Sequence, residues 1–326
     1  MPRLAPPVAR VRSAVRAACR DIAAGELVLV ACSGGPDSMA LAAACAFTAP
    51  RQGLRYGLIT VDHRLQSGSA RQAARVADWA RDTGFSPVEI ATVSVGREGG
   101  PEAAARRSRY EALEEARDRW GARAILLGHT RDDQAETVLL ALARGAGPHG
   151  LAGMPHRRGA LLRPLLDLPR RDTEAACRAQ DLPVWHDPHN SDDGYTRARI
   201  RRAMPLLTAE LGDRLVANLA RTASLVADDN AALETVTARL LADARDGDRL
   251  KTAVLETAPK ALRTRVLRRW LLDRGARSAD LSSAHILAVE ALVVDWRGQR
   301  STQVPGGFSV ARLDDRLVTS VTEPTR

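Results

Sequence analysis

Three features that mark common protein classes are missing from this sequence. No lysine occurs before Lys251, which excludes from that part the phosphate loop of kinases and GTPases, because G-x-x-x-x-G-K-[ST] places a lysine on the phosphates. No run approaches the ~20 apolar residues of a membrane span, and the arginine-bearing N-terminus lacks a signal-peptide core. We therefore expect a cytoplasmic protein without a membrane partner. The cysteines show no C-x-x-C pair and no metal-ligand spacing with histidine, so we expect small buried residues at Cys19, Cys32, Cys45 and Cys177.

The charge balance is the second global feature. The chain has 326 residues, with 48 lysines and arginines against 39 acidic residues, a net charge of +9 and a pI near 10.3. This balance suggests an anionic partner, and composition alone fits a solvated basic surface equally well. The length accommodates a nucleotide-binding domain and one or two smaller units.

The stretch LVLVACSGGPDS, residues 27–38, organises the rest of the chain. Its apolar start is typical of a buried parallel strand, and a second apolar run begins at Met39, so the pattern predicts a strand, a tight loop and a helix. Adjacent glycines bring backbone N–H groups close to a ligand, and the helix presents its positive end. We assign to nucleotide phosphates Ser33, Gly34, Gly35, Pro36, Asp37 and Ser38. A carboxylate repels phosphates unless a cation lies between them, so Asp37 is predicted to bind Mg²⁺ or to form hydrogen bonds.

A single S-G-G need not bind phosphate, because it is also common in a glycine turn whose Ser or Asp caps a helix. The full S-G-G-x-D-S after a strand instead resembles the pyrophosphate-binding loop of the ATP pyrophosphatase class. Members of this class adenylate an oxygen atom, release pyrophosphate and let a nucleophile displace AMP. The resemblance implies ATP as a substrate and leaves the acceptor open, because the class includes NAD, GMP and argininosuccinate synthetases and several tRNA-modifying enzymes.

Strand and helix patterns alternate through the first two-thirds of the chain. Strands are predicted at 54–61, 88–93 and 124–127, and helices at 4–24, 69–82, 101–120 and 169–180. The alternation predicts an α/β fold, a parallel sheet flanked by helices, with ligands beyond the carboxyl ends of the strands. Helical patterns follow at 211–241, 258–273 and 282–296, and short strand-like pieces at 301–304, 308–313 and 317–321 predict a small β meander.

Two polar motifs in the middle of this region are candidate nucleotide contacts. Asp62 and His63 end the second predicted strand, where they could meet adenine and ribose, although a histidine at a strand end is as often a structural hydrogen-bonder. Arg106 and Arg109 are three residues apart and share a helix face. Judged from the sequence alone, a salt-bridged surface face of the helix explains these two arginines better than a nucleotide contact does.

Two carboxylates follow the strand at 124–127. Asp133 and Glu136 share one face of the next helix and could hold a divalent metal or a substrate ammonium group. The alternative is that Thr130 or Asp132 caps this helix and the acids complement its dipole. A glycine-rich segment, typical of a C-cap, ends the helix and leaves Arg144 as a candidate phosphate contact.

A cluster of arginines follows near residue 200. Four arginines in six residues cannot all share one face, so part of the cluster should be free to contact phosphates. A charged helix at a domain boundary is the alternative. The four are Arg197, Arg199, Arg201 and Arg202.

In order and spacing these motifs resemble those of the tRNA(Ile)-lysidine synthetase family, in its short form. The resemblance covers roughly the first two-thirds of the chain. It comprises Ser33–Ser38, Val61–His63, Glu102–Tyr110, Gly128-His129 with Asp132–Thr137, Arg144–Leu151, Arg163–Leu166, Asp187-Pro188-x-Asn190, Arg197–Arg201 and Pro205–Leu207.

The resemblance implies a Rossmann-like fold of the adenine nucleotide alpha hydrolase type. It implies an ATP-binding catalytic domain at 1–207 and a helical tRNA-binding domain with a terminal strand cluster at 208–326. The implied reaction ligates L-lysine to C2 of the wobble cytidine of tRNA(Ile) with a CAU anticodon, through an adenylated cytidine. Aromatic residues make up only 3% of the chain, so arginine contacts to phosphate, and not base stacking, should carry most of the RNA affinity. The oligomeric state stays open, a homodimer included.

The resemblance also suggests roles for the candidate residues. The loop at residues 33–38 would bind ATP and Mg²⁺, and Asp133 and Glu136 would bind the lysine ammonium groups. Three arginines would face the α-phosphate, the lysine carboxylate or RNA, namely Arg106, Arg109 and Arg144. Arg197 and Arg201 would contact substrate. The resemblance does not identify the general base, for which His129 and Asp133 are both candidates.

Three rival functions share parts of this pattern. A tRNA thiolase of the same class needs a cysteine pair or a cysteine-held iron–sulfur cluster, and the four cysteines have neither spacing. An amidating synthetase fed by glutamine needs a glutaminase domain or an ammonia channel. A non-catalytic nucleotide or RNA binder would have no physical need for acids beside bound phosphates, so the intact Asp37, Asp133 and Glu136 argue against it.

Overall fold

The computed structural model describes residues 4–64, 68–93, 101–185, 196–278 and 280–321, with only the backbone at 101–103 and 321. Contacts divide the chain into two compact units, residues 1–227 and 228–326. The functional domains expected from the sequence, 1–207 and 208–326, stay a prediction. No described helix is both long and apolar enough to cross a membrane.

The first unit alternates strands and helices. Its elements are α1 (Pro6–Ala18), β1 (Leu27–Ala31), α2 (Pro36–Thr48), β2 (Arg55–Asp62), α3 (Ser69–Asp82), β3 (Val88–Thr92), α4 (Pro101–Trp120), β4 (Ala124–Leu127), α5 (Arg131–Ala143), α6 (Pro148–Leu151), β5 (Arg157–Arg158), β6 (Leu161–Leu162), α7 (Arg170–Ala179) and α8 (Thr196–Leu211). The long helix α9 (Leu215–Ala244) crosses the boundary between the units.

A six-stranded sheet in the order β3-β2-β1-β4-β6-β5 forms the centre of this unit. Strands β1, β2, β3, β4 and β6 are mutually parallel, and β5 pairs antiparallel with β6 at the edge. The predicted parallel sheet flanked by helices is therefore confirmed. The two-residue strands β5 and β6 were not predicted, because they are too short to show a period.

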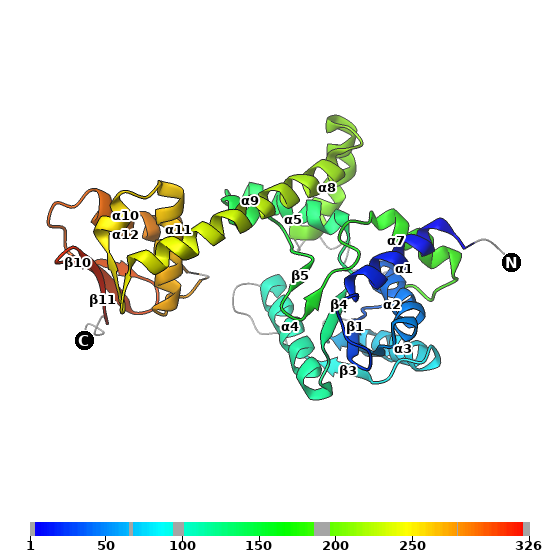
Figure 1. The fold of residues 1–326 in the computed structure, drawn as a ribbon. Helices are drawn as coiled ribbons and strands as arrows, with labels where there is room; N and C mark the ends of the chain where they lie inside the picture. Colours follow the sequence, from blue (N-terminus) through cyan, green and yellow to red (C-terminus); the bar gives the residue numbers. More distant parts are fainter. Residues whose placement is uncertain (1–3, 65–67, 94–100, 186–195, 279, 322–326) are drawn as a thin grey trace. The chain divides into compact units, whose positions relative to one another are not determined.

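The sheet is buried on both faces, which explains why β1 is apolar throughout. Val28 and Val30 pack in a core with residues of α1, α2, α3 and α7. Leu29 and Ala31 point to the opposite face and pack with Leu113 of α4. Figure 1 shows α4 on one side of the sheet and α2 and α3 on the other. The four cysteines are all free and buried, as predicted.

The second unit packs helices against a small antiparallel sheet. Its elements after α9 are β7 (Arg245–Asp246), β8 (Arg249–Lys251), α10 (Thr252–Glu256), α11 (Lys260–Asp273), α12 (Ser283–Val294), β9 (Thr302–Val304), β10 (Phe308–Leu313) and β11 (Arg316–Val321). The strand order is β7-β8-β11-β10-β9. The predicted meander is thus β9-β10-β11, with a tight β10–β11 turn in which Asp314 and Asp315 have positive φ.

The core of the second unit encloses an ion pair. Trp270 is almost fully buried there. Arg263 of α11 donates from Nη2 to Oε1 of Glu290 of α12 at 2.8 Å, and both residues are buried. The Arg263 Nη1 atom also donates to the carbonyl oxygen of Ala258 at 2.7 Å. These contacts tie α11 to α12 and to the end of α10.

Candidate active site

The loop between β1 and α2 has the geometry of a phosphate cradle. Gly34 has a φ of +86°, and a Cβ atom there would lie 2.6 Å from Nε2 of Gln72, so only glycine fits. Helix α2 begins at Pro36, three residues before the apolar run that predicted it, because proline fits the first position of a helix. The free N–H groups of this helix start therefore lie directly behind the glycines.

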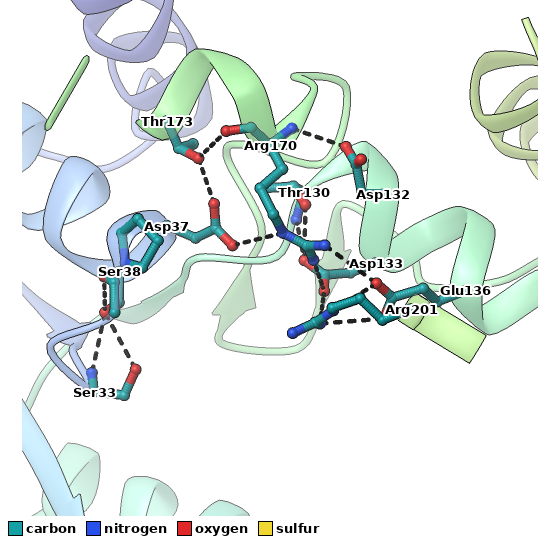
Figure 2. Close-up of polar contacts among 12 residues, drawn as sticks. Ser33, Asp37, Ser38, Thr130, Asp132, Asp133, Glu136, Arg170, Thr173 and Arg201 are labelled. Carbon is teal, nitrogen blue, oxygen red and sulfur yellow. Dashed lines mark hydrogen bonds and ion pairs between the residues drawn. The ribbon is translucent and has the colours of Figure 1, made fainter. Parts of the chain in front are cut away.

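Two serines shape the loop. The Ser38 hydroxyl donates to the carbonyl oxygen of Gly35 at 2.9 Å and accepts from the backbone N–H of Ser33 at 3.2 Å. The Ser33 and Ser38 hydroxyl oxygens are 3.3 Å apart. Ser38 therefore holds the loop closed on itself, and Figure 2 shows these contacts below Asp37.

The end of β4 lies against this loop. A Cβ atom on Gly128 would lie 3.1 Å from the backbone C and O atoms of Asp37 and from the N atom of Ser38. This approach brings the chain after β4, with His129 and the start of α5, next to the loop. The prediction that the motifs gather at the carboxyl ends of the strands is confirmed for β1 and β4.

The Asp37 carboxylate contacts helix α7. Its Oδ1 atom accepts a hydrogen bond from the Thr173 hydroxyl, and its Oδ2 atom accepts one from Arg170 Nε at 3.3 Å. Burial raises the pKa of Asp37 to about 6, with a further increase from the charge of Asp133 and an opposing effect of Arg170. A buried carboxylate with unused lone pairs beside a phosphate cradle fits a Mg²⁺ ion that is otherwise held by nucleotide phosphates and water. The described residues contain no cluster of three or more metal-ligating side chains.

The acid pair, Asp133 and Glu136, lies on the first two turns of α5. The Thr130 backbone N–H and hydroxyl donate to Asp133 Oδ2 at 2.7 and 2.8 Å, so Asp133 also stabilises the start of the helix. Burial alone would raise the pKa of Asp133, but the charge of Arg170 and the Thr130 N–H hold it below its usual value. Glu136 is 3% exposed.

Two arginines from distant segments neutralise the acid pair. Arg170 Nη2 donates to Asp133 Oδ1 at 2.7 Å, and Arg170 Nη1 to Glu136 Oε1 at 3.2 Å. Arg201 of α8 donates from Nε to Glu136 Oε1 at 2.9 Å and from Nη2 to Glu136 Oε2 and Asp133 Oδ1. Figure 2 shows both guanidinium groups converging on the pair, with Arg170 extended between it and Asp37.

Arg170 and Thr173 are the site residues that sequence reasoning missed. Both belong to α7, a helix predicted at 169–180 but given no function. One signal was present: an arginine in the first turn of a helix opposes the helix dipole, which favours acids there. The structure resolves the conflict, because several acids surround Arg170. Burial is the largest single effect and lowers the pKa of Arg170, but the charges of Asp132, Asp133 and Glu136, with that of Asp37, together raise it above the ordinary value.

Two histidines lie within the electrostatic reach of Arg109. Burial lowers the pKa of His129 to about 3, against the charge of Asp133 and with help from Arg109. Burial and then Arg109 also lower the pKa of His63. Within the described ranges, the buried Nδ1 atoms of both histidines have no hydrogen-bond partner. Arg109 therefore places a cationic group near both neutral rings.

Other predicted residues take different positions. Arg106 donates from Nη2 to the Tyr110 hydroxyl at 3.3 Å, one turn further along α4. Asp62 is buried and accepts the backbone N–H of Arg64 at 3.0 Å, which gives it a structural hydrogen bond. Arg144 is exposed just after α5, roughly 16 Å along the helix axis from Asp133 at 1.5 Å per residue. The structure therefore does not bring Arg144 to the acid pair.

One predicted motif and one predicted side chain lie outside the described residues. The Asp187-Pro188-x-Asn190 motif lies outside the described residues, as does the side chain of Glu102. Arg197 is half-buried in the first turn of α8, four residues before Arg201, so the two share a helix face.

The chain matches two protein-family models. Residues 9–207 match the family described as a PP-loop domain, and residues 250–318 match the family described as a TilS substrate binding domain. A tRNA(Ile)-lysidine synthase of Salinispora tropica is 57% identical over 97% of both chains, and one of Thermobifida fusca is 51% identical over 97% of this chain and 98% of the relative.

Among solved structures, a U34-tRNA thiolase of Methanococcus maripaludis covers 68% of this chain and 80% of its own, with a TM-score of 0.58 and 15% identity. At that identity the likeness concerns the fold of the parallel sheet alone. The relatives of high identity span nearly the full length, and the PP-loop match includes the loop, the acid pair and both arginines. This chain belongs to the tRNA(Ile)-lysidine synthase family.

Proposed function

We propose that this chain ligates L-lysine to C2 of the wobble cytidine of tRNA(Ile) with a CAU anticodon. ATP adenylates the C2 oxygen of the cytidine and pyrophosphate leaves. The lysine amine then attacks C2 and AMP departs with that oxygen, which gives lysidine. The change lets the tRNA read AUA as isoleucine instead of AUG as methionine. The observation that best supports this proposal is that the acid pair lies close to the phosphate cradle. The guanidinium group of Arg170 contacts both the acid pair and Asp37.

The loop would bind ATP through the N–H groups of Gly34 and Gly35 and the start of α2, with Ser33, Pro36 and Ser38 setting its shape. Asp37 would share a Mg²⁺ ion with the phosphates. The ion supplies charge neutralisation, and the residues supply positioning. His63 and Asp62 at the end of β2 would border the nucleoside, and Arg109 would face the α-phosphate.

The acid pair would bind the lysine ammonium groups. Two carboxylates suit a substrate with two amines, and ionised acids make stronger hydrogen bonds than neutral ones. Arg201, which donates to both acids, would lie beside the bound lysine and orient its carboxylate. The general base would be His129 or Asp133, and the lowered pKa of each keeps it unprotonated near neutral pH.

The tRNA would contact both parts of the chain. We place the catalytic domain at 1–207 and the tRNA-binding domain at 208–326, which the two family matches support. Arg106, Arg144 and Arg197 are proposed to contact RNA phosphates, in line with the net charge of +9. A homodimer stays a prediction.

The direct test is incorporation of radiolabelled lysine. The purified chain is incubated with ATP, Mg²⁺, labelled lysine and an unmodified CAU-anticodon tRNA(Ile) transcript, and the tRNA is then counted. We expect label that resists mild base, as an amine bonded to the base does and an aminoacyl ester does not. Pyrophosphate release without label would keep the adenylation and refute lysine as the nucleophile.

A pair of variants tests the acid pair. Glu136→Gln should raise the KM for lysine at least 10-fold and leave the KM for ATP within about threefold, because the lost charge faces the amine. The matched control is Glu210→Gln, an exposed residue at the end of α8, which should change neither constant. Equal effects of Glu136→Gln on both substrates would assign Glu136 to the metal or to the fold.

A further inference from the structure

Arg170 connects two sites that the proposed function keeps separate. Its three guanidinium nitrogens each donate to a different acid: Nε to Asp37 behind the loop, Nη1 to Glu136 and Nη2 to Asp133. The main chain of Arg170 is held independently, because its N–H donates to Asp132 Oδ2 at 2.8 Å. The side chain can therefore move while the helix start stays in place.

The lone pairs of Asp133 are fully used in this state. A carboxylate oxygen accepts about two hydrogen bonds. Asp133 Oδ2 accepts two from Thr130, and Asp133 Oδ1 accepts one from Arg170 and one from Arg201. Glu136 Oε1 likewise accepts one from each arginine, and Oε2 accepts one from Arg201. Counting the contacts among described residues, one acceptor position, on Glu136 Oε2, is left for an incoming amine.

The charges also favour an exchange. Three carboxylates share the two guanidinium groups, because Arg170 also pairs with Asp37 through Nε at 3.3 Å. Replacing one guanidinium by the ammonium leaves the net charge of this cluster unchanged and returns the acceptors. Lysine therefore enters by exchange with an arginine.

Arg170 is the better candidate for the exchange that involves nucleotide. Its Nε already contacts Asp37, the neighbour of the loop residue Ser38, so Arg170 is the arginine that links the acid pair to the loop. Within the described part of the chain, Arg201 donates only to the acid pair, and its side chain is 38% exposed, against 18% for Arg170. Displacing Arg201 would move it toward solvent and would not depend on nucleotide.

We infer that Arg170 is an exchangeable counterion, which the acid pair holds in the absence of nucleotide and which the nucleotide phosphates attract when they bind, so that the lysine amine can replace it. The inference rests on the proposed function, since it takes lysine as the ligand of the acid pair. It makes nucleotide and lysine binding positively coupled, and Arg170 is a positioning residue that carries the coupling.

The test is equilibrium binding of L-lysine to the full chain by calorimetry, with and without Mg²⁺ and α,β-methylene-ATP, which cannot release pyrophosphate. For the unaltered protein, we expect the analogue to tighten lysine binding at least 10-fold. Reciprocity requires lysine to tighten binding of the analogue by the same factor. This measurement needs no variant, so it decides the matter even if a variant fails to fold.

Three variants locate the coupling. Arg170→Gln should bind lysine without nucleotide at least 10-fold more tightly than the unaltered protein, and the analogue should then change its affinity less than threefold. Arg201→Gln should keep the nucleotide dependence. Arg171→Gln, the exposed neighbour, should behave like the unaltered protein in both conditions.

The outcomes separate the inference from the function. Lysine binding that is equal with and without the analogue overturns the exchange and leaves the proposed function standing. So does an Arg170→Gln protein that keeps the nucleotide dependence. No lysine binding in either condition, together with no lysine incorporation into tRNA, overturns the proposed function and the exchange with it.

Discussion

Asp37→Asn should make the protein more stable at alkaline pH while it removes activity. The unfolded pKa of Asp37 is near 3.8 and burial raises the folded value to about 6, so the folded state binds its proton more tightly. For such a group, stability falls as pH rises from below 4 to above 6 and is lowest above pH 6. At 1.36 kcal/mol per pKa unit, the buried charge costs roughly 3 kcal/mol at pH 8 and roughly 1 kcal/mol at pH 4.5.

Asparagine removes the charge but loses one hydrogen bond. Its amide oxygen can accept from Thr173 or Arg170, and its NH₂ group faces the other donor, which costs about 1 kcal/mol. The net gain is therefore about 2 kcal/mol at pH 8 and about zero at pH 4.5. For a unit of this size, the gain at pH 8 corresponds to an apparent Tm higher by roughly 4–8 °C.

The assay is thermal unfolding followed by circular dichroism at both pH values. The control is Asp172→Asn, which breaks the pair with Arg10 at 2.7 and 2.9 Å and should destabilise the protein at pH 8 instead of stabilising it. An Asp37→Asn protein that is less stable than the unaltered one at pH 8, or that gains equally at both pH values, would refute the reasoning. The same variant should release no pyrophosphate with ATP and tRNA but keep its tRNA affinity.

Three further outcomes follow from other contacts. Gly128→Ala should raise the KM for ATP at least 10-fold and cost about 1–3 kcal/mol, because its methyl group would press on the Asp37 backbone from 3.1 Å; unchanged ATP kinetics would contradict this. Ser38→Ala should also raise the KM for ATP, with lysine affinity unaffected in calorimetry, because the loop loses its bonds to Ser33 and Gly35. Glu290→Ala should cost about 3–5 kcal/mol, because it leaves the charge of Arg263 buried without a counterion. Limited proteolysis should then cleave the second unit first, and cleavage like that of the unaltered protein would show that the pair adds little.

Local patterns in the sequence determined most of the elements. The helices at 69–82 and 101–120 and the strand at 124–127 match the structure residue for residue, because apolar periodicity reports a helix or strand wherever one face or both are buried. The loop was predictable for a related reason. Two glycines between a buried strand and a helix indicate a tight turn, and Gly34 adopts the positive φ that glycine favours.

Contacts between distant segments could not be read from such patterns. Arg170 meets Asp37 across 133 residues of sequence and Asp133 across 37, and no local period reports which helix start will face which loop. The same limit left Arg144 a candidate for the site, although helix α5 carries it away from Asp133.

The sequence by itself determined which chemistry the chain can perform, since the loop, the acid pair and the arginines are residue types that phosphates and amines require. Only the tertiary structure decided how those groups share charge. The crossing of α7 and α8 over the start of α5 brings two guanidinium groups onto two carboxylates. Their nearly saturated cluster, which Arg170 extends to Asp37, depends on long-range packing, which local sequence preferences do not specify.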